Sequence, residues 1–257
     1  MAKSVYLVKP VYKALHVLEC LGQEKRELSL SQICRRVNLP KTTTYRYLHT
    51  LCASGLVAHN PETDSYRLGL HLWELGQLVE AQLHIRQVAL PFMQQMRDRF
   101  NETVNLGILD GTEIVYVEMV QSKLALRMHA TLGGRDPAYS TAMGKAILSH
   151  LPGEQWREHL PPRLSKRTAK KLTSIATLKV ELRATRKRGF ARDDGENEVG
   201  ARCIGVPILN QRGAVVAALS VSAPAARLND KLEPAVVSAV IETAHAIAQR
   251  LGNHVGK

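Results

Sequence analysis

The segment that most constrains the fold of this chain is residues 29–51, where two short helical patterns flank a break at residues 38–40. Apolar residues recur at helical spacing on both sides of the break, so each helix has one face to bury. Pro40 suits the first turn of the second helix, where its missing N–H has no partner to lose. Two helices joined by a tight turn predict a helix-turn-helix whose second helix contacts DNA.

The second of these helices carries hydroxyls, a phenol and two cations on and beside the face opposite its apolar residues. Such groups hydrogen-bond base edges and phosphates. A solvated surface helix in an ordinary bundle would show a similar pattern, and that alternative stays open at this stage. The residues that we expect to contact DNA are Lys41, Thr42, Thr43, Tyr45 and Arg46.

A hairpin pattern follows directly. Residues 56–59 and 65–68 read as short strands around the turn-forming residues 60–64. A hairpin placed after a recognition helix is a wing, so residues 1–69 are predicted to form a winged helix-turn-helix domain. The tip of the wing carries Glu62 and Asp64 and no cation, so we expect it to add less DNA affinity than the helix.

Residues 70–84 are predicted to form a linker helix. Apolar residues occupy most of its faces, which is typical of a helix that is buried or paired. Pro91 indicates that a new helix begins near residues 86–91. We therefore expect the linker to pack on a second subunit through Leu72, Trp73, Leu75 and Leu78.

Residues 85–257 are predicted to form an α+β domain, because hairpin-like strands alternate with helical segments. Asp110-Gly111 favours a tight turn between its first two strands. Residues 133–137 are expected to be a loop. The expected strands are 103–109, 113–120, 124–129, 201–209 and 214–221, and the expected helices are 141–151, 154–160, 174–188 and 229–251.

The same domain contains the residues of a possible pocket. The acid-rich loop around Asp193 runs into an apolar strand that holds Cys203, and Ser220 and Ser222 share one face of the next strand. The start of the 141–151 helix offers free N–H groups, which favour an anion. A core cysteine and solvated serines would explain the same residues, so the pocket competes with a purely structural interpretation.

Composition narrows the classes of function. The net charge of +12 favours a polyanionic partner, either nucleic acid or an anionic membrane surface. No apolar run is long enough to span a membrane, and the N-terminal residues do not resemble a signal peptide. The four cysteines lack paired spacing and are expected to be reduced thiols in a cytoplasmic protein, without a structural metal.

Two further features stay open. Cys203 could serve a redox enzyme, although apolar neighbours raise a thiol pKa and no histidine stands at ligand spacing beside the acidic segment. No phosphate-binding loop or nucleotide fingerprint is present, so no cofactor is expected.

The stretch from Arg163 to Arg188 holds ten Lys or Arg and one acid, Glu181. It is either a second nucleic-acid surface or a solvated helix face.

Three motifs in order resemble the IclR family of bacterial transcription regulators, over nearly the whole chain. They are Lys-Thr-Thr-Thr-Tyr-Arg-Tyr-Leu at 41–48, Tyr-Ser-Thr-Ala-Met-Gly-Lys-Ala at 139–146 and the segment that begins at Gly189. The segment departs from the family pattern at Leu209, where an aromatic residue or histidine is usual. Residues 124–145 look most like the KdgR-like branch, which regulates sugar-acid breakdown. The family positions matched in the last segment are Gly189, Asp193, Glu196, Cys203, Ile204, Gly205, Ile208 and Asn210.

The resemblance implies a winged helix-turn-helix, a linker helix and a GAF-like effector domain with an antiparallel sheet, assembled as a homodimer or homotetramer. It implies a repressor of a catabolic operon that binds double-stranded operator DNA and is controlled by a small carboxylate, such as a sugar acid or 2-keto acid. No membrane partner is implied. The implied effector residues are Ser140, Thr141, Ala142, Met143, Gly144, Asp193, Cys203, Ser220 and Ser222.

Overall fold

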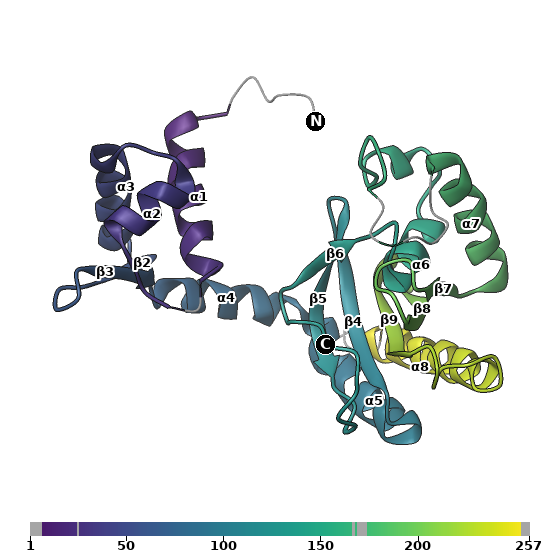
Figure 1. Ribbon diagram of the computed structural model, residues 1–257. Helices are drawn as coiled ribbons and strands as arrows, with labels where there is room; N and C mark the ends of the chain where they lie inside the picture. Colours follow the sequence, from purple (N-terminus) through teal and green to yellow (C-terminus); the bar gives the residue numbers. More distant parts are fainter. Residues whose placement is uncertain (1–6, 25, 166–167, 169–173, 253–257) are drawn as a thin grey trace. The chain divides into compact units, whose positions relative to one another are not determined.

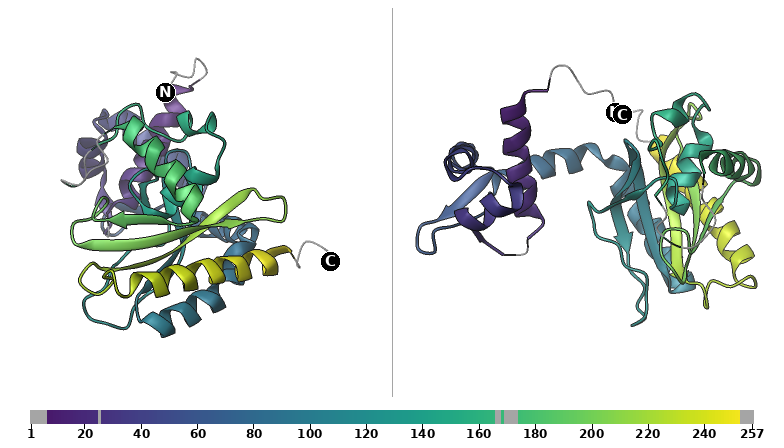
Figure 2. Two further views of the ribbon diagram at one scale, coloured as in Figure 1. Left: turned by 90° about the vertical axis from the view of Figure 1, so that its right-hand side faces the viewer. Right: turned by 45° about the horizontal axis from the view of Figure 1, so that its top comes forward.

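The computed structural model describes residues 7–24, 26–165, 168 and 174–252 (Figures 1 and 2). Its internal contacts divide the chain between Leu83 and His84 into two compact units. Each unit has a hydrophobic core of its own.

The first unit contains the predicted helix-turn-helix. Ser29 caps the second helix, and its hydroxyl and the side chain of Gln32 exchange hydrogen bonds with each other's backbone N–H. Asn38 ends that helix with a left-handed φ of 51°. Pro40 is the residue before the third helix rather than part of its first turn. The helices are α1 (Lys9–Gly22), α2 (Leu30–Val37), α3 (Lys41–Ala53) and α4 (His71–Gln82).

A small sheet completes this unit. Strand β3 (Ser65–Leu68) lies between β1 (Leu28–Ser29) and β2 (Val57–Asn60), and both pairings are antiparallel. β2 and β3 form the predicted wing, and β1 anchors it to the helices. Leu28, which belongs to β1, is fully buried in the core beside Ile33 and Leu48.

The second unit is built on an antiparallel sheet of six strands in the order β6-β5-β4-β9-β8-β7. Helices α5 and α8 pack on one face, whereas α6 packs on the other and α7 lies against α6 (Figure 1). The predicted α+β class is confirmed. The elements are α5 (His84–Phe100), β4 (Thr103–Asp110), β5 (Glu113–Val120), β6 (Arg135–Pro137), α6 (Ala142–His150), the 3-10 turn η1 (Gln155–Arg157), α7 (Ile175–Arg188), β7 (Ala191–Asp194), β8 (Ala201–Leu209), β9 (Val215–Pro224) and α8 (Glu233–Gly252).

The prediction of a strand at residues 124–129 is wrong, and so is that of a loop around Asp193, which belongs to β7 and pairs with β8. In the first of these regions the third strand is β6, which pairs with the start of β5 and lies where a loop was expected. Side chains satisfy the backbone of the 124–129 segment instead: Thr103 Oγ1 donates to the Met128 carbonyl, and Arg227 donates to that of Leu126. The segment therefore needs no neighbouring strand to pair its carbonyls.

Three helical segments also differ from the prediction. α5 begins at His84 and continues through Pro91, because its apolar face, which includes Ala89 and Met93, packs against the sheet. The free energy gained by burying that face offsets the cost of the backbone hydrogen bond that proline removes. Residues 154–160, expected to be a helix, contain only the short η1. Helix α8 begins at Glu233 rather than at residue 229, because the Asn229 side chain accepts hydrogen bonds from backbone N–H groups in a turn before the helix.

Candidate ligand pocket and nucleic-acid interface

The third helix presents the polar face that the sequence predicts. Thr44, Leu48 and Leu51 are buried on its inner side. Tyr45 is 51% exposed, and its ring lies 6.3 Å from that of His49, centroid to centroid. His49 belongs to the same exposed face and was missed, although it follows Tyr45 by one helical turn. Of the residues expected to contact DNA, Lys41, Thr42, Tyr45 and Arg46 are exposed and Thr43 is half-buried.

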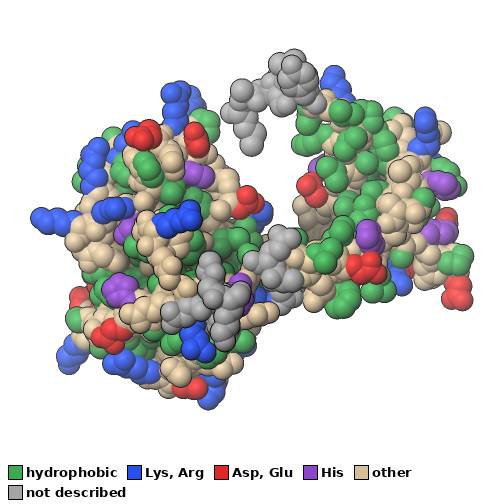
Figure 3. Space-filling view, turned by 180° about the vertical axis from the view of Figure 1, so that it is seen from behind, with side chains coloured by type: hydrophobic (Ala, Val, Ile, Leu, Met, Phe, Trp, Pro, Cys, Tyr) green, Lys and Arg blue, Asp and Glu red, His purple; other side chains and the backbone are tan. Residues whose placement is uncertain are grey.

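Helix α4, where a linker was predicted, exposes large apolar side chains. Trp73 and Leu78 are each 63% exposed, and Val79 is 56% exposed. Leu75 is also exposed and Leu72 is half-buried. Figure 3 shows hydrophobic side chains over much of the visible face of the first unit. Helix α1 also exposes apolar residues; they are Val11, Tyr12 and Leu15.

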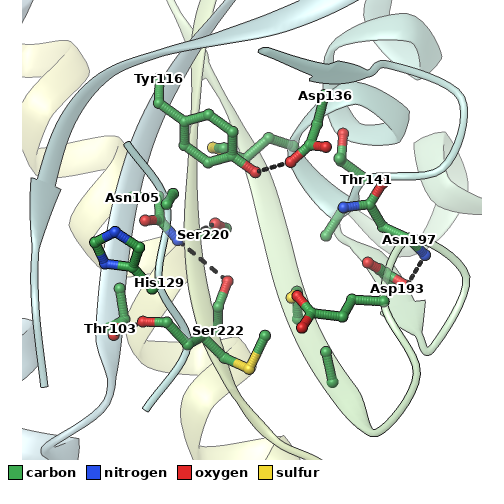
Figure 4. A pocket seen from close by; sticks show the side chains of 17 residues that line it. Thr103, Asn105, Tyr116, His129, Asp136, Thr141, Asp193, Asn197, Ser220 and Ser222 are labelled. Atoms are coloured by element: carbon green, nitrogen blue, oxygen red, sulfur yellow. Dashed lines mark hydrogen bonds between the residues drawn. The ribbon is translucent and has the colours of Figure 1, made fainter. Parts of the chain in front are cut away.

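A pocket opens on the α6 side of the six-stranded sheet (Figure 4). Its base is a row of side chains that are direct neighbours across four strands. Thr103 on β4 faces Ser222 on β9, Ser222 faces Cys203 on β8, and Cys203 faces Asp193 on β7. The cavity volume is about 60 Å³. Since one water needs about 10–15 Å³ of such space, the pocket has room for a few water-sized groups.

Asn105 lies one pleat along from this row, opposite Ser220. Its Nδ2 donates to Ser222 Oγ at 3.1 Å and approaches Ser220 Oγ at 3.5 Å. Its Oδ1 is buried and has no hydrogen-bond partner among the described residues. A buried carbonyl oxygen in this position calls for a donor, and the pocket is where a ligand would provide one.

The start of α6 forms the opposite wall. Two glycines allow it to approach: a Cβ on Gly205 would lie 2.6 Å from the Ala142 carbonyl carbon, and one on Gly144 would lie 2.1 Å from the Ala138 oxygen. Thr141 Oγ1 accepts from the Gly144 N–H at 3.1 Å. The N–H groups of Ala142 and Met143 have no partner within the helix, so the helix start offers two donors to an anion.

An ion pair and backbone hydrogen bonds hold residues 193–197 along one side of the pocket. Lys145 of α6 is fully buried and its Nζ contacts both carboxylate oxygens of Glu196, at 2.6 and 2.7 Å. Asp193 Oδ1 accepts from the backbone N–H of Glu196 at 2.7 Å and of Asn197 at 3.3 Å. Ser140 Oγ donates to Asn197 Oδ1 at 3.0 Å.

Burial controls the protonation of the pocket groups. Desolvation raises the pKa of Asp193, opposed by its backbone hydrogen bonds and by Lys145. Desolvation and then the charge of Asp193 raise the pKa of the Cys203 thiol, which is therefore neutral at ordinary pH and a poor nucleophile. Burial and the neighbouring Asp136 raise the pKa of Tyr116, whose hydroxyl donates to Asp136 Oδ2 at 2.9 Å.

The structure brings most of the expected effector residues to this pocket. Thr141, Ala142, Met143, Asp193, Cys203, Ser220 and Ser222 line it, whereas Ser140 and Gly144 do not and instead hold its wall in place. Several lining residues were missed. Thr103 and Asn105 were detectable, because they are polar residues at alternate positions of an apolar strand. The other polar lining residues that were missed are Tyr116, His129, Asp136, Asn197 and Glu198.

Other kinds of site find no support in the described part of the chain. No group of three or more His, Cys, Asp or Glu side chains there is placed to hold a metal ion. No helix among the described residues is long and apolar enough to cross a membrane.

A helix-turn-helix with an exposed polar face in one unit and a polar pocket in the other are the parts of a ligand-responsive DNA-binding regulator. Comparisons with known proteins agree. The profile of the IclR helix-turn-helix domain matches residues 10–61, and that of the bacterial transcriptional regulator IclR C-terminal domain matches residues 77–249. The chain belongs to the IclR family and is a transcriptional regulator, which points away from catalysis.

Individual relatives cover almost all of the chain. The regulator XynR of Escherichia coli is 35% identical over 87% of this chain and 89% of its own length. The regulator KdgR of the same organism is 34% identical over 96% of this chain and 94% of its own, which confirms the resemblance to the KdgR-like branch. An IclR homologue from Microbacterium hydrocarbonoxydans, solved with 4-hydroxybenzoate, has a TM-score of 0.80 and 29% identity over 93% of this chain and 98% of its own.

Proposed function

We propose that the chain represses a catabolic operon in the bacterial cytoplasm and is controlled by a small carboxylic acid, such as a sugar acid or a 2-keto acid. Residues 1–69 bind the operator, residues 70–84 link the two parts, and residues 85–257 bind the effector. The observation that carries the proposal is the pocket: one wall offers N–H donors to a carboxylate, and the base offers hydroxyls and unpartnered acceptors.

The ligand lies with its carboxylate at the start of α6. There the N–H groups of Ala142 and Met143 and the partial positive charge of the helix end stabilise an anion. The rest of the ligand extends over the sheet, where the hydroxyls of Ser220 and Ser222 hydrogen-bond its oxygens. Asp193 keeps one oxygen free of backbone bonds. That oxygen accepts from a ligand hydroxyl.

The acceptors in the pocket favour a hydroxylated acid over a plain one. Asn105 Oδ1 lacks a donor among the described residues, and the carboxylates of Asp136, Asp193 and Glu198 line the pocket. A second anionic group on the ligand would be repelled, whereas hydroxyl groups would be paired. Aromatic acids such as 4-hydroxybenzoate, which the Microbacterium homologue holds, test this preference, because their ring supplies few donors.

Calorimetry with a panel of sugar acids, 2-keto acids and aromatic acids tests the effector assignment. The best acid should bind Ser220→Ala and Asp193→Ala more weakly by about tenfold or more, since losing one partner of a buried hydrogen bond costs about 1–3 kcal/mol. The exposed Ser238→Ala of α8 is the matched control. Binding of aromatic acids alone, or unchanged binding by both pocket variants, would reject the proposed ligand class.

The DNA-binding face of α3 supports contact through Lys41, Thr42, Thr43, Tyr45 and Arg46 with a near-palindromic operator. Arg46→Ala should weaken binding to the mapped operator by about 1–3 kcal/mol, and the exposed Arg250→Ala of α8 should not. Gel shifts measure both. Equal binding by Arg46→Ala and the unsubstituted protein would remove α3 from the interface. Loss of reporter expression when the protein is supplied, reversed by the effector, distinguishes repression from activation.

We also propose that the protein is a homodimer or homotetramer, with Leu72, Trp73, Leu75 and Leu78 packed on a second copy. The exposure of several large apolar side chains on α4 supports this, because a monomer seldom leaves such a surface in water. Leu78→Glu should shift light scattering toward the monomer, whereas Val180→Glu, at an equally exposed residue of α7, should not. A stable monomer of the unsubstituted protein at micromolar concentration would contradict this assembly.

A further inference from the structure

The positive charge of this protein does not come mainly from its helix-turn-helix unit. Residues 1–83 hold ten Lys or Arg and seven Asp or Glu, a net charge of +3. Residues 163–188 hold ten cations and one acid, a net charge of +9, and the rest of 84–257 holds fifteen of each sign. The excess positive charge of the second unit therefore comes from one segment, for which the proposed function has no role.

The described part of that segment includes α7, whose cations form one side of a groove. Lys179, Arg183 and Arg186 follow at helical spacing, so they share a face of α7, and all three are exposed. The end of α6 and the turn after it form the other side. The groove is lined by Ser149, His150, Leu151, Pro152, Gly153, Trp156, Lys179, Leu182, Arg183 and Arg186.

The described residues leave these cations without anionic partners. Lys179 and Arg183 form no ion pair with any of them, and Arg186 donates only to the Ser149 carbonyl, at 3.4 Å. Glu181, the one acid of α7, pairs with Arg188 at 2.6 Å. A solvated helix face usually intersperses charges of both signs, so this groove is better suited to an external polyanion.

We propose that the groove between α6 and α7 binds the phosphate backbone of DNA, as a second DNA-binding surface separate from α3. Lys179 and Arg186 are seven residues apart, which is about 10 Å along a helix. One DNA strand passes about three phosphates over that length. Three cations in line therefore match three successive phosphates, without touching the bases, so the groove adds affinity that does not depend on sequence.

Salt dependence measures this interaction directly, because neutralising each phosphate releases counterions. The full-length variant Lys179→Gln/Arg183→Gln/Arg186→Gln is titrated with a mixed-sequence duplex several helical turns long, from about 50 to about 200 mM salt. The slope of log Kobs against log salt should become shallower by about 0.9 for each phosphate that is no longer neutralised, and so by up to about 2.7. Urea unfolding verifies that the variant is folded.

The matched control removes the same charge elsewhere. Arg212→Gln/Lys231→Gln/Arg250→Gln changes three exposed cations in the β8–β9 turn and around α8. It should leave the slope unchanged. Equal reductions in both triple variants would mean a general effect of net charge, and no reduction in the α7 variant would mean that the groove does not bind DNA; either result overturns the proposal. Neither result bears on the operator contacts of α3, which Arg46→Ala tests separately.

Discussion

The buried ion pair between Lys145 and Glu196 should be among the most sensitive points of the second unit. The Lys145 side chain is fully enclosed, whereas 19% of the Glu196 side chain is exposed. Breaking a buried pair costs about 3–5 kcal/mol, because the remaining charge is left in a poorly solvated place. Lys145→Met leaves a carboxylate with some access to water, so we expect a loss of about 3 kcal/mol, the low end. Glu196→Gln leaves an enclosed ammonium group and should cost more.

Urea unfolding measures these losses. Trp156 reports on α6, because it is buried and its Nε1 donates to the Leu148 carbonyl at 2.7 Å. A Trp73→Phe background removes the other tryptophan. The double variant Lys145→Met/Glu196→Gln should lose much less than the sum of the single losses, since it leaves no unpaired charge. Losses below about 1 kcal/mol in both single variants, or strict additivity, would refute the reasoning.

Three further predictions concern the pocket. Gly205→Ala should displace the start of α6 and weaken effector binding in calorimetry at least tenfold, whereas Gly153→Ala, whose Cβ would meet nothing within 4 Å, should bind normally. Asp193→Asn keeps the acceptor for the Glu196 N–H but removes a carboxyl whose folded pKa is raised above 3.8. A raised pKa in the folded state stabilises the protein below the ordinary pKa of the carboxyl, and this stabilisation is lost as the pH rises through the folded pKa. Asp193→Asn lacks this dependence, so urea unfolding should show that its stability rises relative to that of the unsubstituted protein across this pH window. Asn105→Leu should weaken a hydroxylated acid about tenfold or more and its deoxy analogue less, if the two are compared by calorimetry.

The sequence by itself determined the local architecture. Helical periodicity in residues 29–51 and the turn residues at 60–64 were enough for the helix-turn-helix and wing, because both depend on neighbours along the chain. Alternation of serines with apolar residues likewise placed Ser220 and Ser222 on one face of β9, where both now lie beside Asn105. The three motifs in order indicated the family.

Only the tertiary structure decided which distant segments meet. The segment 124–129 had the composition of a strand but gives its carbonyls to Thr103 and Arg227, so a short strand at 135–137 pairs with β5 instead. The pairing of Lys145 with Glu196, fifty-one residues apart, depends on how α6 packs on β8. Periodicity describes which face of an element is buried, but a pocket is formed by contacts between faces, and those depend on strand order and packing.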